Sequence, residues 1–458
     1  MKKINKTILL SGILLASTSM IFAVPDPEPT PTYTSALSGS KYTMATDSYE
    51  VFSSHRAAMG GAGLGVTGFY DSYLYNPANI SKDGFKLYMP TLTTSINNVQ
   101  SLIAPGDDDN GDPQDGLFEL YDRYNAGESM DDLSGDLVGL MLNSINSGYG
   151  EVATVNVRTG VKFRNFGLNL DIQDKVRSYN FGLGSSTASY LDQLDIVASG
   201  ALGFNIPIND AFSVDLGALV AFNYRVYSKG LGVTEALGLM EDFSNETLTQ
   251  QIPLTAGYSV PITLGANLNM PLDMTLSVVG RNINDTFHYT TYNNFENFMN
   301  FDPTMTTLLG TMTHEYTGSD DEIAGSINYE PNDASSFDVT NDWQMDVGLT
   351  WAPKWKLIKP VIALDILEAN KLFDDVETSD DFTMNILESA HVGTQLTLLG
   401  FLDFRAGLSS GYKSVGAGFD IPFLVHVDAA YYFKEFGTVL GESPSDVLSI
   451  KLSLLSGK

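Results

Sequence analysis

The chain has 458 residues, a formal net charge of −30 and no cysteine. So acidic a chain disfavours nucleic-acid binding, which depends on positive potential, and the lack of cysteine excludes a disulfide and a lipoprotein anchor. Hydrophobic residues make up 43% and aromatic residues 11% of the chain, which is too apolar for an acidic disordered protein.

Residues 1–23 have the layout of a secretory signal peptide. Lysines 2, 3 and 6 precede an apolar run at 8–15, and Ala23 offers a small residue for cleavage. That run is too short to cross a bilayer as a helix. Residues 24–53 follow as a proline-rich spacer and N-terminal segment. We therefore expect an exported protein.

Residues 54–85 form a glycine-rich stretch that precedes the first strand-like sequence. Gly60, Gly61 and Gly63 allow positive φ and close approach of backbone to backbone. Asn76-Pro77-Ala78 then predicts a turn, because proline fixes φ and restricts the residue before it. A segment threaded through a confined space would need these features, although a flexible loop could also be rich in glycine.

The sequence RAAMGGAG at 56–63, followed by YNPA at 75–78, resembles the start of FadL-type outer-membrane transporters. In that family, which transports long-chain fatty acids and other hydrophobic compounds, this segment is a hatch inside a barrel, and Asn-Pro-Ala is its signature. PorV-type relatives carry a similar segment and dock exported proteins. The resemblance covers about twenty-five residues, so the rest of the chain has to be examined separately.

Alternation of apolar and polar residues dominates the chain after residue 85. In 153–163, Val155, Val157 and Val161 share one face, whereas Asn156 and Arg158 share the other. The sequence predicts an all-β fold, a transmembrane antiparallel β-barrel of about 14 strands over 86–458. The predicted strands are 86–97, 152–164, 166–174, 190–208, 212–227, 258–269, 273–283, 342–352, 359–367, 386–398, 401–408, 413–421, 424–433 and 446–456.

The connections between the predicted strands alternate in length. Short turns, such as 270–272 and 399–400, are expected at the periplasmic end, and long loops at the extracellular end. Only 409–412 is short where a long loop is expected. The long loop at 98–151 is acidic, and Asp107, Asp109 and Asp112 could bind Ca²⁺, but EF-hand spacing is absent. A solvated acidic loop is the alternative, and we predict no metal site.

Two long loops, 228–257 and 284–341, contain more apolar residues than exposed loops usually do, and the second has helical spacing. In the resembled family, the corresponding loops form a groove that captures an acyl chain. Flexible methionine and aromatic side chains suit such a groove, but they could equally pack the loops together as a lid. The candidate capture residues are Phe295, Phe298, Met299, Phe301, Leu239, Met240 and Phe243.

Five basic residues fall on water-facing positions of the predicted strands. They could pair with Asp171, Asp215, Asp365, Asp403 and Asp428 to stabilise the lumen, or one could bind a fatty-acid carboxylate. The sequence does not select among them. These candidates are Arg158, Lys162, Arg225, Arg281 and Arg405.

An outer-membrane enzyme is the competing class. His426 and Asp428 form an inward-facing pair at strand spacing, but no nucleophile motif such as Gly-x-Ser-x-Gly accompanies them. We therefore predict no enzymatic activity and no cofactor.

The sequence as a whole predicts a monomer in the cell outer membrane, inserted by the barrel-assembly machinery and surrounded by outer-membrane lipid. By the family resemblance, it would take up hydrophobic small molecules such as long-chain fatty acids passively, through loop capture and hatch gating. The alternatives are a PorV-like barrel that docks secreted proteins and a general porin. Ligand identity and the exit route, periplasmic or lateral, stay open.

Overall fold

The structure is a computed structural model. It describes residues 41–43, 47–82, 85–105, 115–129, 132–133, 135–136, 139–140, 148–180, 188–228, 231–232, 254–303, 312–315, 327–329, 336–353, 355–372, 385–421, 424–436, 441 and 443–454. Residues 1–23, 106–114 and 233–250 lie outside this set, and with them the predicted signal peptide, the aspartates considered for Ca²⁺, and Leu239, Met240 and Phe243.

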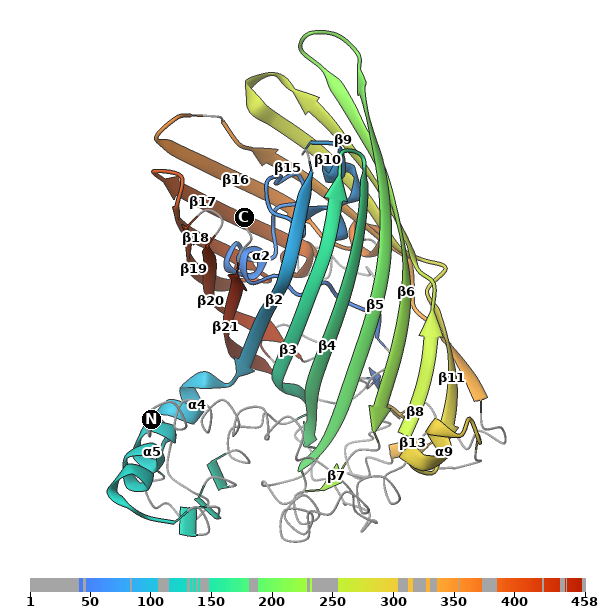
Figure 1. Cartoon of the computed structure of the whole chain (residues 1–458), viewed down its shortest axis with the longest axis vertical. Helices are drawn as coiled ribbons and strands as arrows, with labels where there is room; N and C mark the ends of the chain where they lie inside the picture. Colours follow the sequence, from blue (N-terminus) through green and yellow to red (C-terminus); the bar gives the residue numbers. More distant parts are fainter. Residues whose placement is uncertain are drawn as a thin grey trace.

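The described strands form one closed antiparallel barrel of 14 strand positions, which confirms the predicted fold class. The ring closes where the first strand pairs with the last, with Thr91 opposite Ser453 (Figure 1). The wall consists of β2 (Lys86–Asn97), β3 (Gly148–Phe163), β4 (Phe166–Asn180), β5 (Ala188–Pro207), β6 (Ser213–Ser228), β8 (Leu254–Ser259) with β9 (Ile262–Met270), β10 (Met274–Ile283) with β11 (Thr286–Tyr292), β14 (Ser336–Thr340) with β15 (Gln344–Trp351), β16 (Ile358–Ile366), β17 (Ala390–Leu398), β18 (Leu402–Ser409), β19 (Tyr412–Ile421), β20 (Val425–Glu435) and β21 (Pro444–Leu454).

Three neighbouring wall positions are each split in two, which the sequence did not predict. β6 pairs with β9 up to Val220 and then with β8 from Asn223. Pro261 between β8 and β9 has no N–H to give to the ladder, and Asn284 between β10 and β11 has a φ of 63°. As a result, 286–292 and 336–340, which were assigned to a long loop, are wall strands.

The outer surface of the barrel is apolar. Leu168 and Val220 are 47% and 48% exposed, whereas Asn169 and Asp171, on the inner face of β4, are buried. Exposed aromatic residues gather toward the short-turn end of the wall, among them Phe163, Phe204 and Trp355. An apolar outer band next to an aromatic girdle is the surface that a bilayer requires of a barrel, and it places the protein in the outer membrane.

The remaining described elements are short. They are β1 (Lys41–Thr43), β12 (Met312–Glu315) and β13 (Ile327–Tyr329), which form a small separate sheet; β7 (Leu231–Gly232); α2 (Ser54–Ala58), α3 (Ser72–Tyr75), α4 (Val99–Ile103), α5 (Leu117–Ala126) and α9 (Phe295–Met299); and η2 (Pro77–Lys82), η4 (Pro271–Asp273) and η5 (Ala369–Lys371). None of the helices in the described part of the chain is long and apolar enough to cross a membrane.

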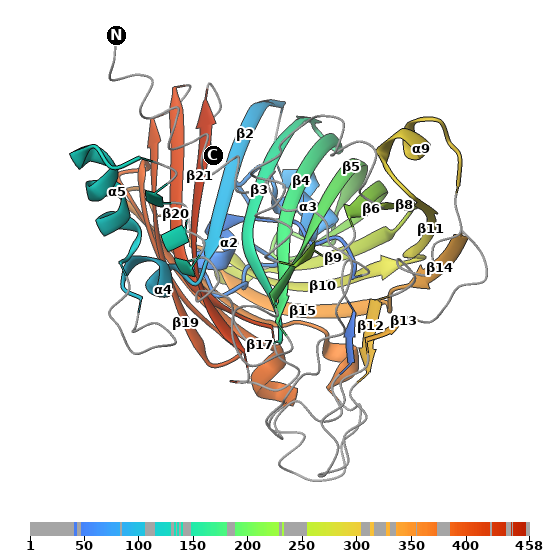
Figure 2. The same cartoon turned by 90° about the horizontal axis from the view of Figure 1, so that it is seen from below.

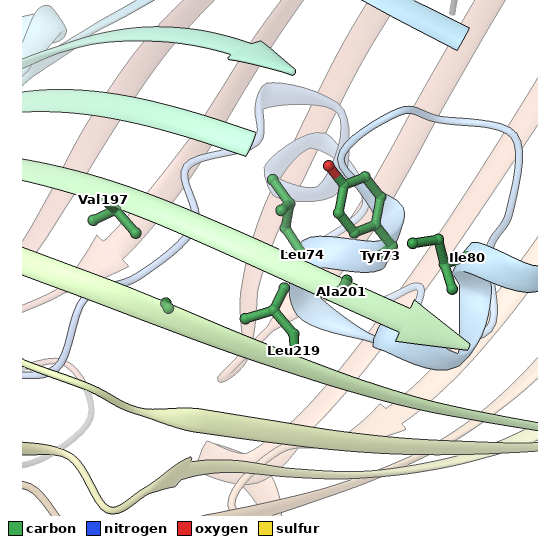
Figure 3. Packing of buried hydrophobic residues seen from close by; sticks show 7 residues of the cluster. Tyr73, Leu74, Ile80, Val197, Ala201 and Leu219 are labelled. Atoms are coloured by element: carbon green, nitrogen blue, oxygen red, sulfur yellow. The ribbon is translucent and has the colours of Figure 1, made fainter. Parts of the chain in front are cut away.

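Residues 47–82, called the interior segment below, lie inside the ring of strands. Figure 1 shows α2 of this segment inside the wall, and Figure 2 shows both α2 and α3 surrounded by it. The segment is continuous with the barrel core: Tyr73, Leu74 and Ile80 pack on Val197 and Leu219 of β5 and β6 (Figure 3). Since the short turns lie at the opposite end from α4, α5 and α9, the long-loop end is the extracellular end.

Candidate functional site

The Asn-Pro-Ala turn is pressed against wall glycines. A Cβ at Gly217 of β6 would overlap the Pro77 carbonyl and the Ala78 nitrogen, and one at Gly265 of β9 would overlap the Asn76 side chain. Only a wall position without a side chain lets the turn approach this closely.

A second glycine contact holds the other end of the interior segment. A Cβ at Gly407 or Gly393 would overlap Met59, and Gly60 itself has a φ of 65°. The His391 ring lies against this turn, with Nδ1 2.6 Å from the Gly60 carbonyl oxygen. Two tight backbone contacts on separate groups of strands therefore fix the segment across the lumen.

Side-chain amides tie the Asn-Pro-Ala turn to the wall and to the rest of the segment. Asn76 Nδ2 donates to the Leu64 carbonyl at 2.7 Å and to Asn267 Oδ1 at 2.9 Å. Asn267 Nδ2 in turn donates to Asn79 Oδ1 at 2.8 Å. These three buried asparagines satisfy one another, which explains why an amide is needed at position 76.

Asp365 of β16 holds the glycine-rich part of the segment. Its Oδ2 accepts hydrogen bonds from the backbone N–H groups of Gly63 and Leu64 at 2.6 and 2.9 Å. The sequence placed Asp365 among the partners of lumen cations; the structure shows it accepting backbone amides of the interior segment instead.

A buried histidine lies at the start of α2. The Ser53 hydroxyl donates to Asp71 Oδ2 at 2.8 Å, so its oxygen accepts from His55 Nδ1–H, which is 2.9 Å away. The His55 ring stacks on Phe69 with centroids 3.9 Å apart. Burial lowers the pKa of His55 to about 4 even though Asp71 opposes the shift. His55 is therefore neutral at physiological pH.

The five predicted lumen cations are buried in the wall or paired with carboxylates. Arg158 Nε donates to Asp171 at 2.7 Å, and Arg405 donates to Asp428 and Asp403 at 2.6 and 3.0 Å. The partners of the next two differ from those considered: Arg225 pairs with Asp195 at 2.5 Å and Arg281 with Asp346 at 2.8 Å. Lys162 is buried.

A cavity of about 370 Å³ lies between the interior segment and the wall and reaches Tyr412 and Glu435 at the extracellular ends of β19 and β20. Of the five predicted cations, Arg281 is the one that lines it among the described residues. One side of the cavity is apolar, formed by Val51 and Leu74 of the segment and by Val197, Leu219 and Ala221 of the wall.

The opposite lining is charged and includes residues that sequence reasoning missed. Arg56 and Lys175 face the cavity together with Glu50. Burial alone would raise the pKa of Glu50, but Lys434, Lys175, Arg281 and Arg56 outweigh it and lower the pKa. Lys175 is two residues after Gln173, so it lies on the same lumen-facing side of the strand. Extending the predicted strand 166–174 by one residue would have identified it.

The described loop candidates lie outside this cavity. Phe298 of α9 packs edge-on against Tyr292, with centroids 5.4 Å apart, beside the outward-facing Tyr224. Phe295, Met299 and Phe301 are 43%, 59% and 80% exposed. The predicted helical turn is present, but it covers the outer rim of the barrel.

His426 and Asp428 form a structural contact. His426 Nε2 lies 2.6 Å from Asp428 Oδ2, but Asp428 also accepts from Arg405, and neither His426 nor Asp428 lines the cavity.

No protein-family model matches the chain, and no curated protein matches it. Solved structures do. The monoaromatic hydrocarbon channel CymD is 11% identical, with 88% of this chain and 97% of that chain covered and a TM-score of 0.41. A Pseudomonas aeruginosa FadL homologue is 13% identical over 88% and 98%, with a TM-score of 0.38. The Pseudomonas putida toluene transporter TodX is 9% identical over 89% and 98%, with a TM-score of 0.39. In its Asn-Pro-Ala segment and its closed barrel, the chain resembles FadL-type outer-membrane transporters.

Proposed function

We propose that the protein is an outer-membrane channel for the passive uptake of hydrophobic compounds such as long-chain fatty acids, and that the interior segment is its hatch. The observation that carries this proposal is the cavity inside the barrel. Its apolar side, which includes Leu74 and Leu219, offers a surface for hydrocarbon, and its extent to Tyr412 and Glu435 offers an approach from the cell surface. Its volume lies within the range of small-molecule sites.

In this proposal, the exposed apolar residues of the extracellular rim, Phe295, Met299 and Phe301, make the first contact with a hydrophobic compound. The compound then enters the cavity along its apolar side. Passage toward the periplasm requires part of the interior segment to shift, because the segment is fixed to the wall at Pro77 and at Met59. Diffusion down a gradient drives the process, and a change in the segment gates it.

The experiment tests the hatch turn. Asn76→Ala removes three hydrogen bonds, two donated by the side-chain amide and one accepted by Oδ1 from the Ala78 N–H, and Pro77→Gly loosens the turn. Uptake of radiolabelled oleate into cells should therefore fall while the barrel still assembles. Assembly is checked by heat-modifiable migration in gels. Asp210→Asn, in the exposed turn between β5 and β6, is the control. Unchanged uptake of every hydrophobic compound tried would contradict the proposal.

Ion conductance separates this proposal from a general porin. Because the interior segment occupies the lumen, the protein in planar bilayers should show little steady conductance. A steady open-channel current from the intact protein would favour the porin instead.

A further inference from the structure

The interior segment begins at the extracellular side of the barrel. Arg177, three residues before the end of β4, donates from Nη2 to both carboxylate oxygens of Asp47 at 2.8 Å. Arg225, three residues before the end of β6, donates to the Asp47 backbone carbonyl at 2.5 Å. Because β4 and β6 both end at long loops, these contacts place Asp47 near the extracellular mouth.

Later residues of the segment contact β4 progressively closer to its periplasmic start. The Tyr49 hydroxyl donates to Asp171 Oδ2 at 2.5 Å. A Cβ on Gly167, the second residue of β4, would lie 3.0 Å from Ile80 and 3.1 Å from Tyr73. The contacted positions of β4 therefore run from 177 through 171 to 167 as the segment runs from 47 to 80. The segment crosses the lumen from the extracellular end to the periplasmic end.

The residues on either side of the segment agree with this direction. After it, β2 begins at Lys86, which pairs with Lys162 beside the short turn between β3 and β4. Before it, residues 41–43 form β1, which pairs with β12, with Lys41 opposite Glu315 (Figure 2). Since β12 belongs to the long connection between β11 and β14, the chain before the interior segment lies at the extracellular end.

Asp47 holds this end of the segment through charge. It accepts from Arg177 and lies 3.6 Å from Arg225, whose side chains are 2% and 0% exposed, whereas the Asp47 side chain is 46% exposed. A buried guanidinium is costly without a partner of opposite charge. The two arginines therefore favour a conformation that keeps the Asp47 carboxylate at the mouth.

This direction determines on which side of the membrane the preceding residues lie. The interior segment already occupies the lumen, and residues 24–40 contain four prolines and two acidic residues but no basic residue. A polar, proline-rich sequence of this kind has little apolar surface to bury inside a barrel.

We propose that the chain enters its own barrel from the outside, that residues 24–40 are displayed at the cell surface, and that Asp47 is the clamp that keeps them there. The inference goes beyond the proposed uptake function and does not depend on what the channel carries. It means that the hatch is connected to the cell surface by its own chain.

The lack of cysteine allows a test by single-cysteine labelling. Intact cells carrying Ser35→Cys are treated with a maleimide on a polyethylene glycol too large to cross the outer membrane. Ser35→Cys should be labelled as completely as Asp122→Cys, on the exposed face of the extracellular helix α5. Asp210→Cys, in the exposed short turn between β5 and β6, should be labelled only after the outer membrane is permeabilised.

Each other result overturns the display. Labelling of Ser35→Cys only after permeabilisation would place this stretch in the periplasm, and labelling only after unfolding would enclose it in the lumen. Intact-mass measurement shows whether the stretch is retained, and a mature chain that begins after residue 35 would also contradict the proposal. Because labelling needs no ligand, failure here leaves the uptake function standing, and failed oleate uptake leaves the display standing.

Asp47→Asn tests the clamp separately. It keeps the size of the side chain and removes its charge, so exchange of backbone amides in 47–53 should accelerate about tenfold or more, the effect of losing a hydrogen bond to a charged group. Exchange in 72–82 should stay slow. Asp338→Asn, at an exposed outward carboxylate, is the matched control. Unchanged exchange in 47–53 would show that Asp47 is not the clamp.

Discussion

Wall glycines are the residues on which the position of the interior segment depends. The sequence has 42 glycines. Alternation separates the inward-facing Gly217 from Gly200, which pairs with the outward-facing Val220, but it does not show which inward-facing glycine receives the Pro77 carbonyl. The Asn-Pro-Ala turn could be predicted from three consecutive residues. Its partners could not, because they come from strands more than a hundred residues away.

Gly217→Ala is expected to displace the interior segment. The added methyl overlaps backbone atoms of Pro77 and Ala78, which cannot rotate away, and overpacking of this kind costs about 1–3 kcal/mol. The thermal unfolding midpoint in detergent should fall, and hydrogen exchange in 72–82 should rise. Gly200→Ala is the control, since its Cβ would lie 3.7 Å from Leu168 Cδ2, an ordinary contact. Equal unfolding midpoints and equal exchange in the two variants would contradict a close contact between Gly217 and the Asn-Pro-Ala turn.

His55 is expected to make stability depend on pH. Its pKa is about 4 in the folded protein against 6.5 for the ordinary value, so the unfolded chain binds more protons between these values. Stability should therefore be full above pH 6.5 and decline as pH falls toward 4, by about 3 kcal/mol at most.

The measurement is thermal unfolding from pH 7.5 to pH 4.5, with the wild type compared with His55→Gln. The variant should lose part of the pH dependence, whereas His288→Gln should keep it, because the His288 side chain is 49% exposed on the outside. If His55→Gln unfolds with the same pH dependence as the wild type, the buried histidine is not the titrating group.

The interior segment behaves as one element because wall side chains hold it at several points. Asp365 is the clearest example of such a contact, because one of its carboxylate oxygens accepts hydrogen bonds from two consecutive backbone N–H groups. Sequence reasoning grouped Asp365 with the lumen charges, because parity shows only that a side chain faces inward. It cannot show whether the partner is a guanidinium or a glycine amide brought from residue 63.

Asp365→Ala should free the Gly63–Leu64 turn without opening the barrel. Two hydrogen bonds to a charged acceptor are lost, each worth about 1.5–3 kcal/mol, so exchange of amides in 60–66 should accelerate while that of β16 and β17 stays slow. Mass spectrometry of exchanged peptides measures both. Asp338→Ala, at an exposed outward carboxylate, is the control. Protection of 60–66 that matches the wild type would show that other contacts hold the turn.

The sequence predicts that each wall strand exists, but it predicts less well where each strand begins and ends. Alternation identified all 14 positions, because each strand has one face toward lipid and one toward the lumen. Alternation did not predict the interruptions at Pro261 and Asn284. The same odd or even positions face the lumen on both sides of each interruption, so the pattern of period two continues across it. The extension of β4 to Asn180 was missed for a related reason, because the outward face becomes polar after Ile172.

The apolar outer surface of the barrel holds the whole molecule in the bilayer, so a charge placed on this surface should destabilise it. Val220 lies midway along β6 and is 48% exposed. Val220→Arg should lower the free energy of unfolding in lipid bilayers by about 2–4 kcal/mol, the cost of a cation near the midplane. Urea titration of the bilayer-inserted protein measures it, and Asp210→Arg in the exposed turn should change little. A Val220→Arg variant as stable as the control would place this surface away from lipid.

The pairing of Thr91 with Ser453 has a consequence for biogenesis. The seam joins the earliest wall strand to the one translated last, and the glycines that receive Met59 belong to strands near the carboxyl end. The interior segment and β2 therefore cannot make these contacts until nearly the entire chain has been exported. A periplasmic factor that shields this segment during export would therefore favour correct closure of the barrel.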